Sequence, residues 1–164
     1  MLHIANTQTE LWVNLLKEAE NRAQTKLTEN QESYMVFMLM RFIARCELLS
    51  TTLALQYLES MLEKRRVKEV MLADTADTSL LFAGLFPERS KKLNVSSAYF
   101  MNISRSCFLG LADLCENMKH VGEATLYREI GTNIEKLTHV LYCTRVEHKA
   151  NPEIFRVTGK EVLH

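Results

Sequence analysis

Helix-breaking residues are scarce along this chain. Only two prolines and five glycines occur among its 164 residues, and apolar residues recur at the three- and four-residue spacing of amphipathic helices. Few breakers imply long helices joined by few turns. A chain of this length fits one domain and can bury a core without a disulfide or a metal. The sequence therefore predicts an all-α, single-domain bundle of five or six helices.

The apolar pattern divides the chain into six candidate helices. We expect them at about residues 9–26, 30–49, 52–63, 66–82, 96–119 and 123–147. The second and the fifth are apolar on most faces, which predicts that they are central. Thr7 or Thr9 and Asn30 are the expected N-caps of the first two helices. After residue 147 the pattern is lost, so we predict a helical domain at 1–147 and a tail at 148–164.

The stretch between the fourth and fifth helices contains residues that are expected to end a helix. Gly84 is expected to end the fourth helix in a left-handed conformation, with Leu85 packing back on Leu80, and Pro87 then opens an isolated turn. Upstream, we favour one helix running unbroken through the sequence DTADTS, although Asp77 is an alternative cap for a separate short helix. Gly110, inside the fifth helix, is expected to allow another helix to approach closely.

Charge and hydropathy exclude several classes of function. Lys plus Arg and Asp plus Glu each number 20, so no bulk attraction to nucleic acid or to an anionic membrane is expected. The most apolar run, residues 34–40, is far shorter than the ~20 residues of a membrane span. The beginning of the chain lacks the pattern of a signal peptide. These features predict a cytoplasmic protein that binds neither nucleic acid nor membrane.

The four cysteines are expected to be reduced core thiols. None belongs to a C-x-x-C pair, and each lies in an apolar, helix-like segment, the environment in which free cysteine is usually buried. They are Cys46, Cys107, Cys115 and Cys143.

Motifs for metal binding or catalysis are weak. The only Glu-x-x-His occupies residues 161–164. Glu116 with His120, and Glu135 with His139, have helical i,i+4 spacing, but each pair lies on a polar face and is expected to be a surface pair. The chain has no G-x-S-x-G motif and no Gly-rich phosphate loop. We predict neither a dedicated metal site nor another cofactor, and enzymatic activity stays open.

One polar cluster is a candidate site. Arg41 lies in the most apolar helix and must be paired if it is buried; Asp74, Asp77 and Glu88 are its candidate partners. A cluster of such residues forms either a structural network or the polar floor of a ligand-binding pocket. The candidate ligand-binding residues are Arg41, Asp77, Glu88, Tyr99 and Arg105.

Protein binding is the function that the sequence favours. Eight methionines are present, and methionine adapts to irregular interfaces, although it also fills cores. The segment 123–147 is amphipathic and can pack within its own chain or against a second copy. We therefore expect a protein-interaction or regulatory module, with a homodimer as the favoured assembly. The alternative is a ligand- or metal-dependent enzyme with a polar site in the bundle core.

Two stretches resemble one family of proteins. The sequence DTSLLFAGLFPERSKKLNVSSAYFMNISRSCFLGLAD, residues 77–113, and ESYMVFMLMRF, residues 32–42, are similar to a family of uncharacterised proteobacterial helical proteins. The resemblance implies a bacterial, cytosolic, helical protein. It also implies that four residues of the longer stretch belong to the family's sequence pattern: Gly84, Pro87, Tyr99 and Arg105. That family has no assigned activity, so no catalytic residue follows from it.

Overall fold

The computed structural model describes residues 7–44, 65–96 and 98–148. Within these ranges the chain is all-helical, as predicted, but it forms seven helices instead of five or six. They are α1 (Gln8–Ala23), α2 (Glu29–Ala44), α4 (Arg65–Leu85), α5 (Glu88–Lys92), α6 (Tyr99–Asn117), α7 (Val121–Thr132) and α8 (Ile134–His148). The helix expected at 52–63 and the tail after residue 148 lie outside the described residues.

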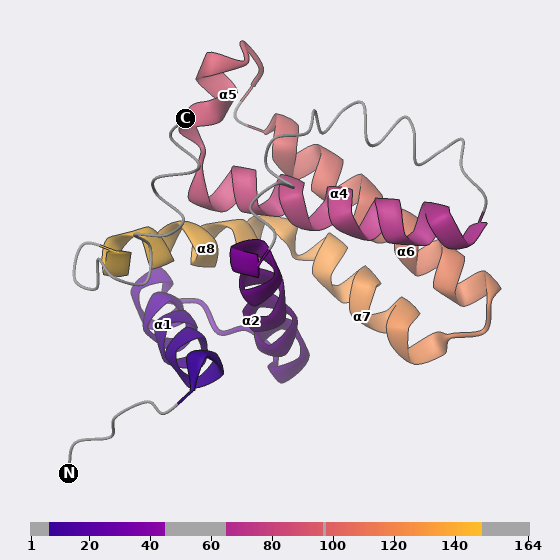
Figure 1. Ribbon diagram of the computed structural model, residues 1–164, viewed down its shortest axis with the longest axis horizontal. Coiled ribbons are helices and arrows are strands. Elements are labelled where there is room, and N and C mark those ends of the chain that lie inside the picture. Colours follow the sequence, from indigo (N-terminus) through magenta and orange to yellow (C-terminus); the bar gives the residue numbers. More distant parts are fainter. Residues whose placement is uncertain (1–6, 45–64, 97, 149–164) are drawn as a thin grey trace.

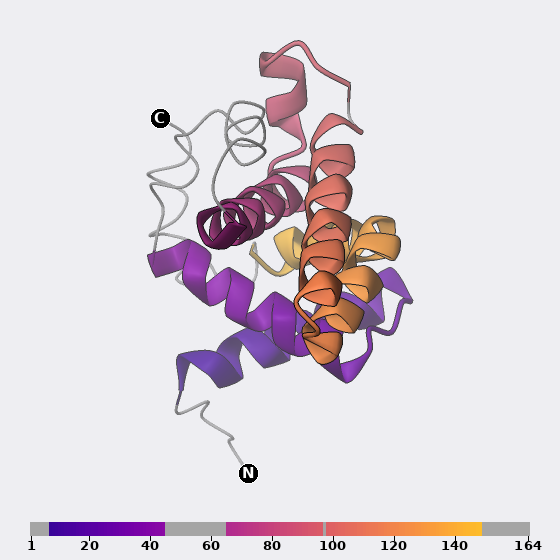
Figure 2. The ribbon, with the colours of Figure 1, turned by 90° about the vertical axis from the view of Figure 1, so that its right-hand side faces the viewer.

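The helices pack as a bundle around α4 and α6 (Figures 1 and 2). α4 packs against α6 and α8, and α6 also packs against α7. The prediction of a central α6 is therefore matched. Among the described elements, however, α4 shares the centre with it, whereas α2 contacts α1 and α7. None of the described helices is long and apolar enough to cross a membrane.

Local capping begins the first two helices. The side chain of Thr7 accepts a hydrogen bond from the N–H of Glu10, as expected for the cap of α1. The cap of α2 was predicted wrongly as Asn30. Instead, the N–H of Gln31 donates to Oγ1 of Thr28 (3.2 Å), and the N–H of Thr28 donates to Oε1 of Gln31 (3.0 Å). This reciprocal pair is a capping box.

The single helix predicted at 123–147 is in fact two helices. α7 ends at Thr132, and the side-chain amide of Asn133 donates to the carbonyl of Glu129 (2.7 Å). Asparagine competes in this way with the helical backbone bonds. The apolar side chains along both helices nevertheless face inward: Ile130, Ile134, Leu137 and Leu141 are at most 1% exposed.

Gly84 has a different role from the one predicted. It lies inside the last turn of α4, and no described glycine has a positive φ. A Cβ placed on Gly84 would lie 2.5 Å from Cβ of Leu141 and 3.2 Å from the carbonyl oxygen of Thr138. The missing side chain therefore lets α4 approach α8. Leu85 is the buried last residue of α4, so it does not pack back on Leu80 as a residue beyond the helix.

Gly110 does not mark a close approach. The nearest atom to a Cβ built there is Cδ1 of Leu72, at the ordinary contact distance of 3.9 Å. The prediction of close approach at this position was therefore wrong. The close contact to α6 is made instead by Gly131 of α7, where an added Cβ would lie 3.0 Å from the side chain of Leu109.

Gly84 and Gly110 make a matched pair for a stability test. Gly84→Ala should destabilise the fold by about 1–3 kcal/mol, because α4 and α8 must separate to admit the methyl group. Gly110→Ala should stabilise it by roughly 0.5–1 kcal/mol, because alanine loses less entropy in a helix. Urea unfolding followed by circular dichroism measures both. Equal midpoints for the two variants would contradict the packing described for α4 and α8.

Candidate functional site

Two of the five predicted site residues meet in the interior. Nη2 of Arg41 on α2 lies 2.8 Å from Oδ2 of Asp77 on α4. This confirms Asp77 as a partner of Arg41. α4 continues through Asp77, as favoured, so Asp77 does not cap a separate helix. The arginine side chain is 51% exposed and that of the aspartate only 10%, so the pair reaches from the core to the surface.

Tyr34, which was not among the predicted site residues, completes this group. Its hydroxyl donates to Oδ1 of Asp77 at 2.5 Å, so each carboxylate oxygen has a partner. Tyr34 and Arg41 are seven residues apart on α2, which places them on one face two turns apart. The guanidinium also lies over the Tyr34 ring, 5.7 Å from its centroid. The i,i+7 spacing was the signal that could have identified Tyr34.

The electrostatics of this group follow from burial. Desolvation raises the pKa of Asp77 above its usual range, while the hydrogen bond from Tyr34 and the charge of Arg41 act in the opposite direction. Burial, and then the charge of Asp77, raises the pKa of Tyr34 well above its ordinary value. Tyr34 therefore remains a hydrogen-bond donor. With both oxygens satisfied, the group has the character of a structural network.

The other three predicted residues lie elsewhere. Oε1 of Glu88 on α5 is 2.5 Å from Nη2 of Arg145 on α8. Arg105 pairs with Glu135 at 3.1 Å.

The fifth residue, Tyr99, has its ring against Phe100, with centroids 5.2 Å apart. The five side chains thus divide among two separate surface ion pairs, one buried network and one ring contact. They do not line one common pocket among the described residues.

A second cluster, which the sequence analysis missed, joins three helices. Glu69 of α4, Cys115 of α6 and Glu123 of α7 bring one sulfur and two carboxylate oxygens within 4.8 Å of one another. Sγ of Cys115 lies 3.8 Å from Oε2 of Glu123. Burial, with Glu69 and Glu123 beside it, raises the pKa of the Cys115 thiol to about 11. We call these three residues the Glu–Cys–Glu cluster.

His120 lies at the edge of this cluster. Its Nδ1 is 3.8 Å from Oε2 of Glu123. The expected surface pair of His120 with Glu116 does not form, because Glu116 instead accepts from Arg128 at 2.8 Å. The chain turns between α6 and α7, and this turn carries His120 towards Glu123 rather than back along α6.

Tyr127 connects the two polar groups. Burial raises the pKa of its hydroxyl to about 12, with further contributions from Cys115 and Asp77. Its ring contacts that of Tyr34 edge-on, with centroids 6.3 Å apart, and stacks on Phe108. One aromatic layer therefore separates the buried network of Asp77 from the Glu–Cys–Glu cluster.

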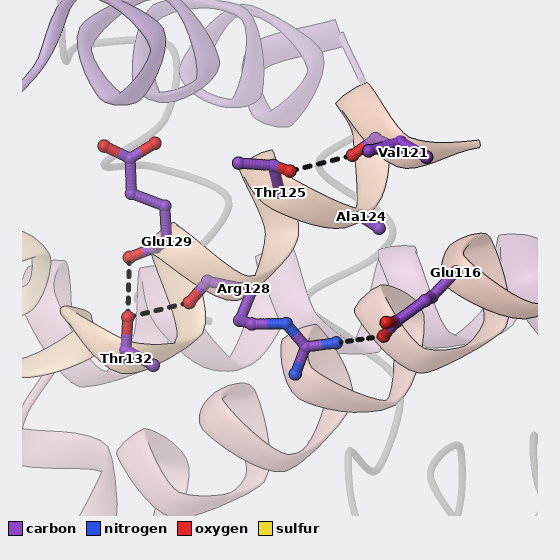
Figure 3. Close-up of a pocket in the computed structure, with 7 residues that line it drawn as sticks. All are labelled: Glu116, Val121, Ala124, Thr125, Arg128, Glu129 and Thr132. Atoms are coloured by element: carbon purple, nitrogen blue, oxygen red, sulfur yellow. Dashed lines mark hydrogen bonds and ion pairs between the residues drawn. The ribbon is translucent and has the colours of Figure 1, made fainter. Parts of the chain in front are cut away.

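A groove of about 480 Å³ runs along the outer side of α7 (Figure 3). In it, the Thr125 hydroxyl donates to the carbonyl of Val121, and the Thr132 hydroxyl donates to the carbonyl of Arg128, both at 2.8 Å. These hydroxyls are satisfied by their own helix, so the groove is more apolar than its composition suggests. Its lining residues are Glu116, Val121, Ala124, Thr125, Arg128, Glu129 and Thr132.

The one cation in the groove has two carboxylate partners. Arg128 is held between Glu116, at 2.8 Å, and Asp113, at 3.3 Å. The carboxylate of Glu129 points away from Arg128 and Glu116 (Figure 3). The groove lining thus holds two carboxylates, those of Glu116 and Glu129, and one guanidinium, that of Arg128, so its net charge is −1.

Comparison with known proteins adds no assignment. No protein-family model, no curated protein and no solved structure matches the chain. The resemblance of residues 32–42 and 77–113 to a proteobacterial family therefore stays a prediction.

The buried network predicts a pH-dependent effect of Tyr34→Phe. Removing the hydroxyl deletes a bond that lowers the pKa of Asp77, so the pKa in the folded state should rise further. A raised carboxyl pKa gives stability that is complete below the ordinary value of 3.8 and is lost as the pH rises through the folded value. Relative to the wild-type chain, Tyr34→Phe should therefore lose more stability at neutral pH than below 3.8.

Chemical unfolding across this pH range measures that difference. Tyr99→Phe is the matched control, because the Tyr99 ring contacts Phe100 and takes no part in the Asp77 network. Its effect on the unfolding free energy should not vary with pH. A pH-independent effect of Tyr34→Phe would contradict the description of the network.

Proposed function

We propose that this chain is a protein-interaction module, and that the groove on α7 binds an amphipathic helix carrying basic residues. The observation that supports this most strongly is that two threonine hydroxyls in the groove donate to backbone carbonyls of their own helix. Because the hydroxyls of Thr125 and Thr132 donate to carbonyls of α7, a partner can cover them without leaving their O–H donors unpaired.

The spacing of the groove residues suits a helix. Val121, Thr125, Arg128 and Thr132 follow intervals of four, three and four residues along α7, which forms one stripe on its surface. Val121 is 69% exposed, so apolar surface remains to be covered at one end. Helix-in-groove recognition places apolar side chains of the partner at the same spacing against such a stripe.

Charge indicates the kind of partner. Two carboxylates of the groove lining, those of Glu116 and Glu129, outnumber its one cation, Arg128, and Asp113 beside the groove also pairs with Arg128. Lysine or arginine at the flanks of a bound helix would complement these carboxylates. Rim charges of this kind chiefly increase the association rate and the specificity.

Self-association has a weaker basis in this account. The expected homodimer rested on the apolar face of segment 123–147, and Ile134, Leu137 and Leu141 on that face are fully buried within the chain. A dimer would have to use another surface. We therefore propose a separate protein as the occupant of the groove.

The enzyme alternative also has little support. It placed a ligand or metal site among the five predicted residues, and three of these, Glu88, Tyr99 and Arg105, have partners outside the Asp77 network.

We further infer a bacterial, cytoplasmic protein, from the family resemblance and from three buried free cysteines among the described residues.

Peptide binding tests the proposal. A fluorescent Leu–Lys peptide that forms an amphipathic helix should bind the wild-type chain, as measured by anisotropy. Thr125→Arg should weaken binding by about tenfold or more, because the new side chain fills the exposed groove and repels lysine. Asn14→Arg, which adds the same charge at an exposed site on α1, should bind like the wild-type chain.

Two results would count against this function. One is equal binding by Thr125→Arg and the wild-type chain. The other is equal affinity for a Leu–Glu peptide of the same pattern, since the groove should repel it. A dimer detected by light scattering and abolished by Thr125→Arg would instead assign the groove to a second copy of the chain.

A further inference from the structure

We propose that Glu69, Cys115 and Glu123, the Glu–Cys–Glu cluster, form a binding site for one divalent metal ion. The chemistry of these donors points to zinc. The inference is independent of the peptide groove, because it rests on a different set of side chains.

The composition of the cluster favours a metal. A thiolate, two carboxylates and a neighbouring imidazole are the ligand types that zinc takes in proteins. Each of the three ligands comes from a different helix, α4, α6 and α7. Converging ligands on separate elements are typical of a structural site, in which the ion fastens the elements together.

The separation of Cys115 and Glu123 fits tetrahedral coordination. Zinc–sulfur and zinc–oxygen bonds of about 2.3 Å and 2.1 Å place the two ligand atoms about 3.6 Å apart. The observed separation between Sγ of Cys115 and Oε2 of Glu123 is 3.8 Å. Nδ1 of His120 is also 3.8 Å from that oxygen, which makes this half-exposed ring the candidate for a fourth ligand.

Burial and exposure are arranged as a metal site requires. Cys115 is fully buried, and its sulfur is directed at the carboxylate of Glu123. The side chains of Glu123 and His120 are 61% and 51% exposed, which leaves an entry path from solvent. Two carboxylates close to one sulfur repel each other unless a proton or a cation lies among them.

Metal binding exchanges one cation for one proton. In the metal-free chain the Cys115 thiol keeps its proton and donates weakly to Glu123. On binding, the S–H bond breaks, the proton leaves to the buffer and sulfur bonds to the metal as a thiolate. No oxidation or reduction takes place.

Cobalt reports on the thiolate directly. Titrating the metal-free full chain with Co²⁺ should produce the ultraviolet charge-transfer band of a cobalt–thiolate bond, saturating at one ion per chain, and Zn²⁺ should displace it. Zinc should also raise the midpoint of thermal unfolding, because it binds the folded state. Cys115→Ser should abolish the band.

Glu123→Gln keeps the test decisive if Cys115→Ser fails to fold. Its side chain is largely exposed, so the variant should fold normally and bind Co²⁺ at least about tenfold more weakly. Glu18→Gln, at an exposed position on α1, and Cys107→Ser, which removes a different buried thiol, are the matched controls. Both should retain the band with wild-type affinity.

Several outcomes would overturn the site. Uptake of Co²⁺ by the wild-type chain without a thiolate band would mean adventitious binding to surface carboxylates. A band that survives in Glu123→Gln with unchanged affinity would exclude Glu123 as a ligand, and a band that survives in Cys115→Ser would place the metal at another cysteine. No uptake at all would leave the cluster as a thiol hydrogen-bonded to a carboxylate.

Discussion

A carboxylate in the middle of α4 constrains the rest of this structure. Asp77 is 7% exposed, and a buried charge without partners costs several kcal/mol. Both of its partners come from α2, two turns apart, so their side chains fix the register of α2 relative to Asp77 on α4. A shift of α2 by one residue would turn Tyr34 and Arg41 away and leave the carboxylate unpaired.

The same constraint extends to the helices that carry the candidate sites. The Tyr34 ring contacts Phe108 of α6 and Tyr127 of α7, so the position of α2 also fixes where α7 packs. On its inner side α7 is held by the close contact of Gly131 with Leu109. Its outer side is left with the groove, and its first turn carries Glu123 towards Cys115. The buried network is therefore the support for both sites.

The sequence mainly predicted structural features that depend on neighbouring residues. It missed most features that depend on contacts between distant segments of the chain. The helical class, the cap at Thr7 and the unbroken α4 follow from spacing and side-chain chemistry within a few residues. The need to neutralise an arginine in an apolar helix indicated three candidate partners, Asp74, Asp77 and Glu88, and the structure pairs Arg41 with Asp77. The capping box at Thr28 was also local, and the T-x-x-Q pattern was overlooked in favour of Asn30.

The remaining errors have one physical origin. Gly84 was interpreted from its own helix, whereas its role depends on Leu141, far along the chain. Asn133 lies within a regular apolar pattern that gave no sign of the break between α7 and α8. The Glu–Cys–Glu cluster joins residues 69, 115 and 123, and only the packing of three helices brings them together.

We propose that the outer face of α7 binds a partner while the buried network holds the helices in place. Amide chemical shifts of the labelled chain, followed by NMR during titration with the Leu–Lys peptide, test it most directly. We expect shifts confined to α7 and the adjoining end of α6, with the amides around Tyr34, Arg41 and Asp77 unchanged. Shifts centred on Arg41 and Asp77, with α7 unaffected, would contradict it.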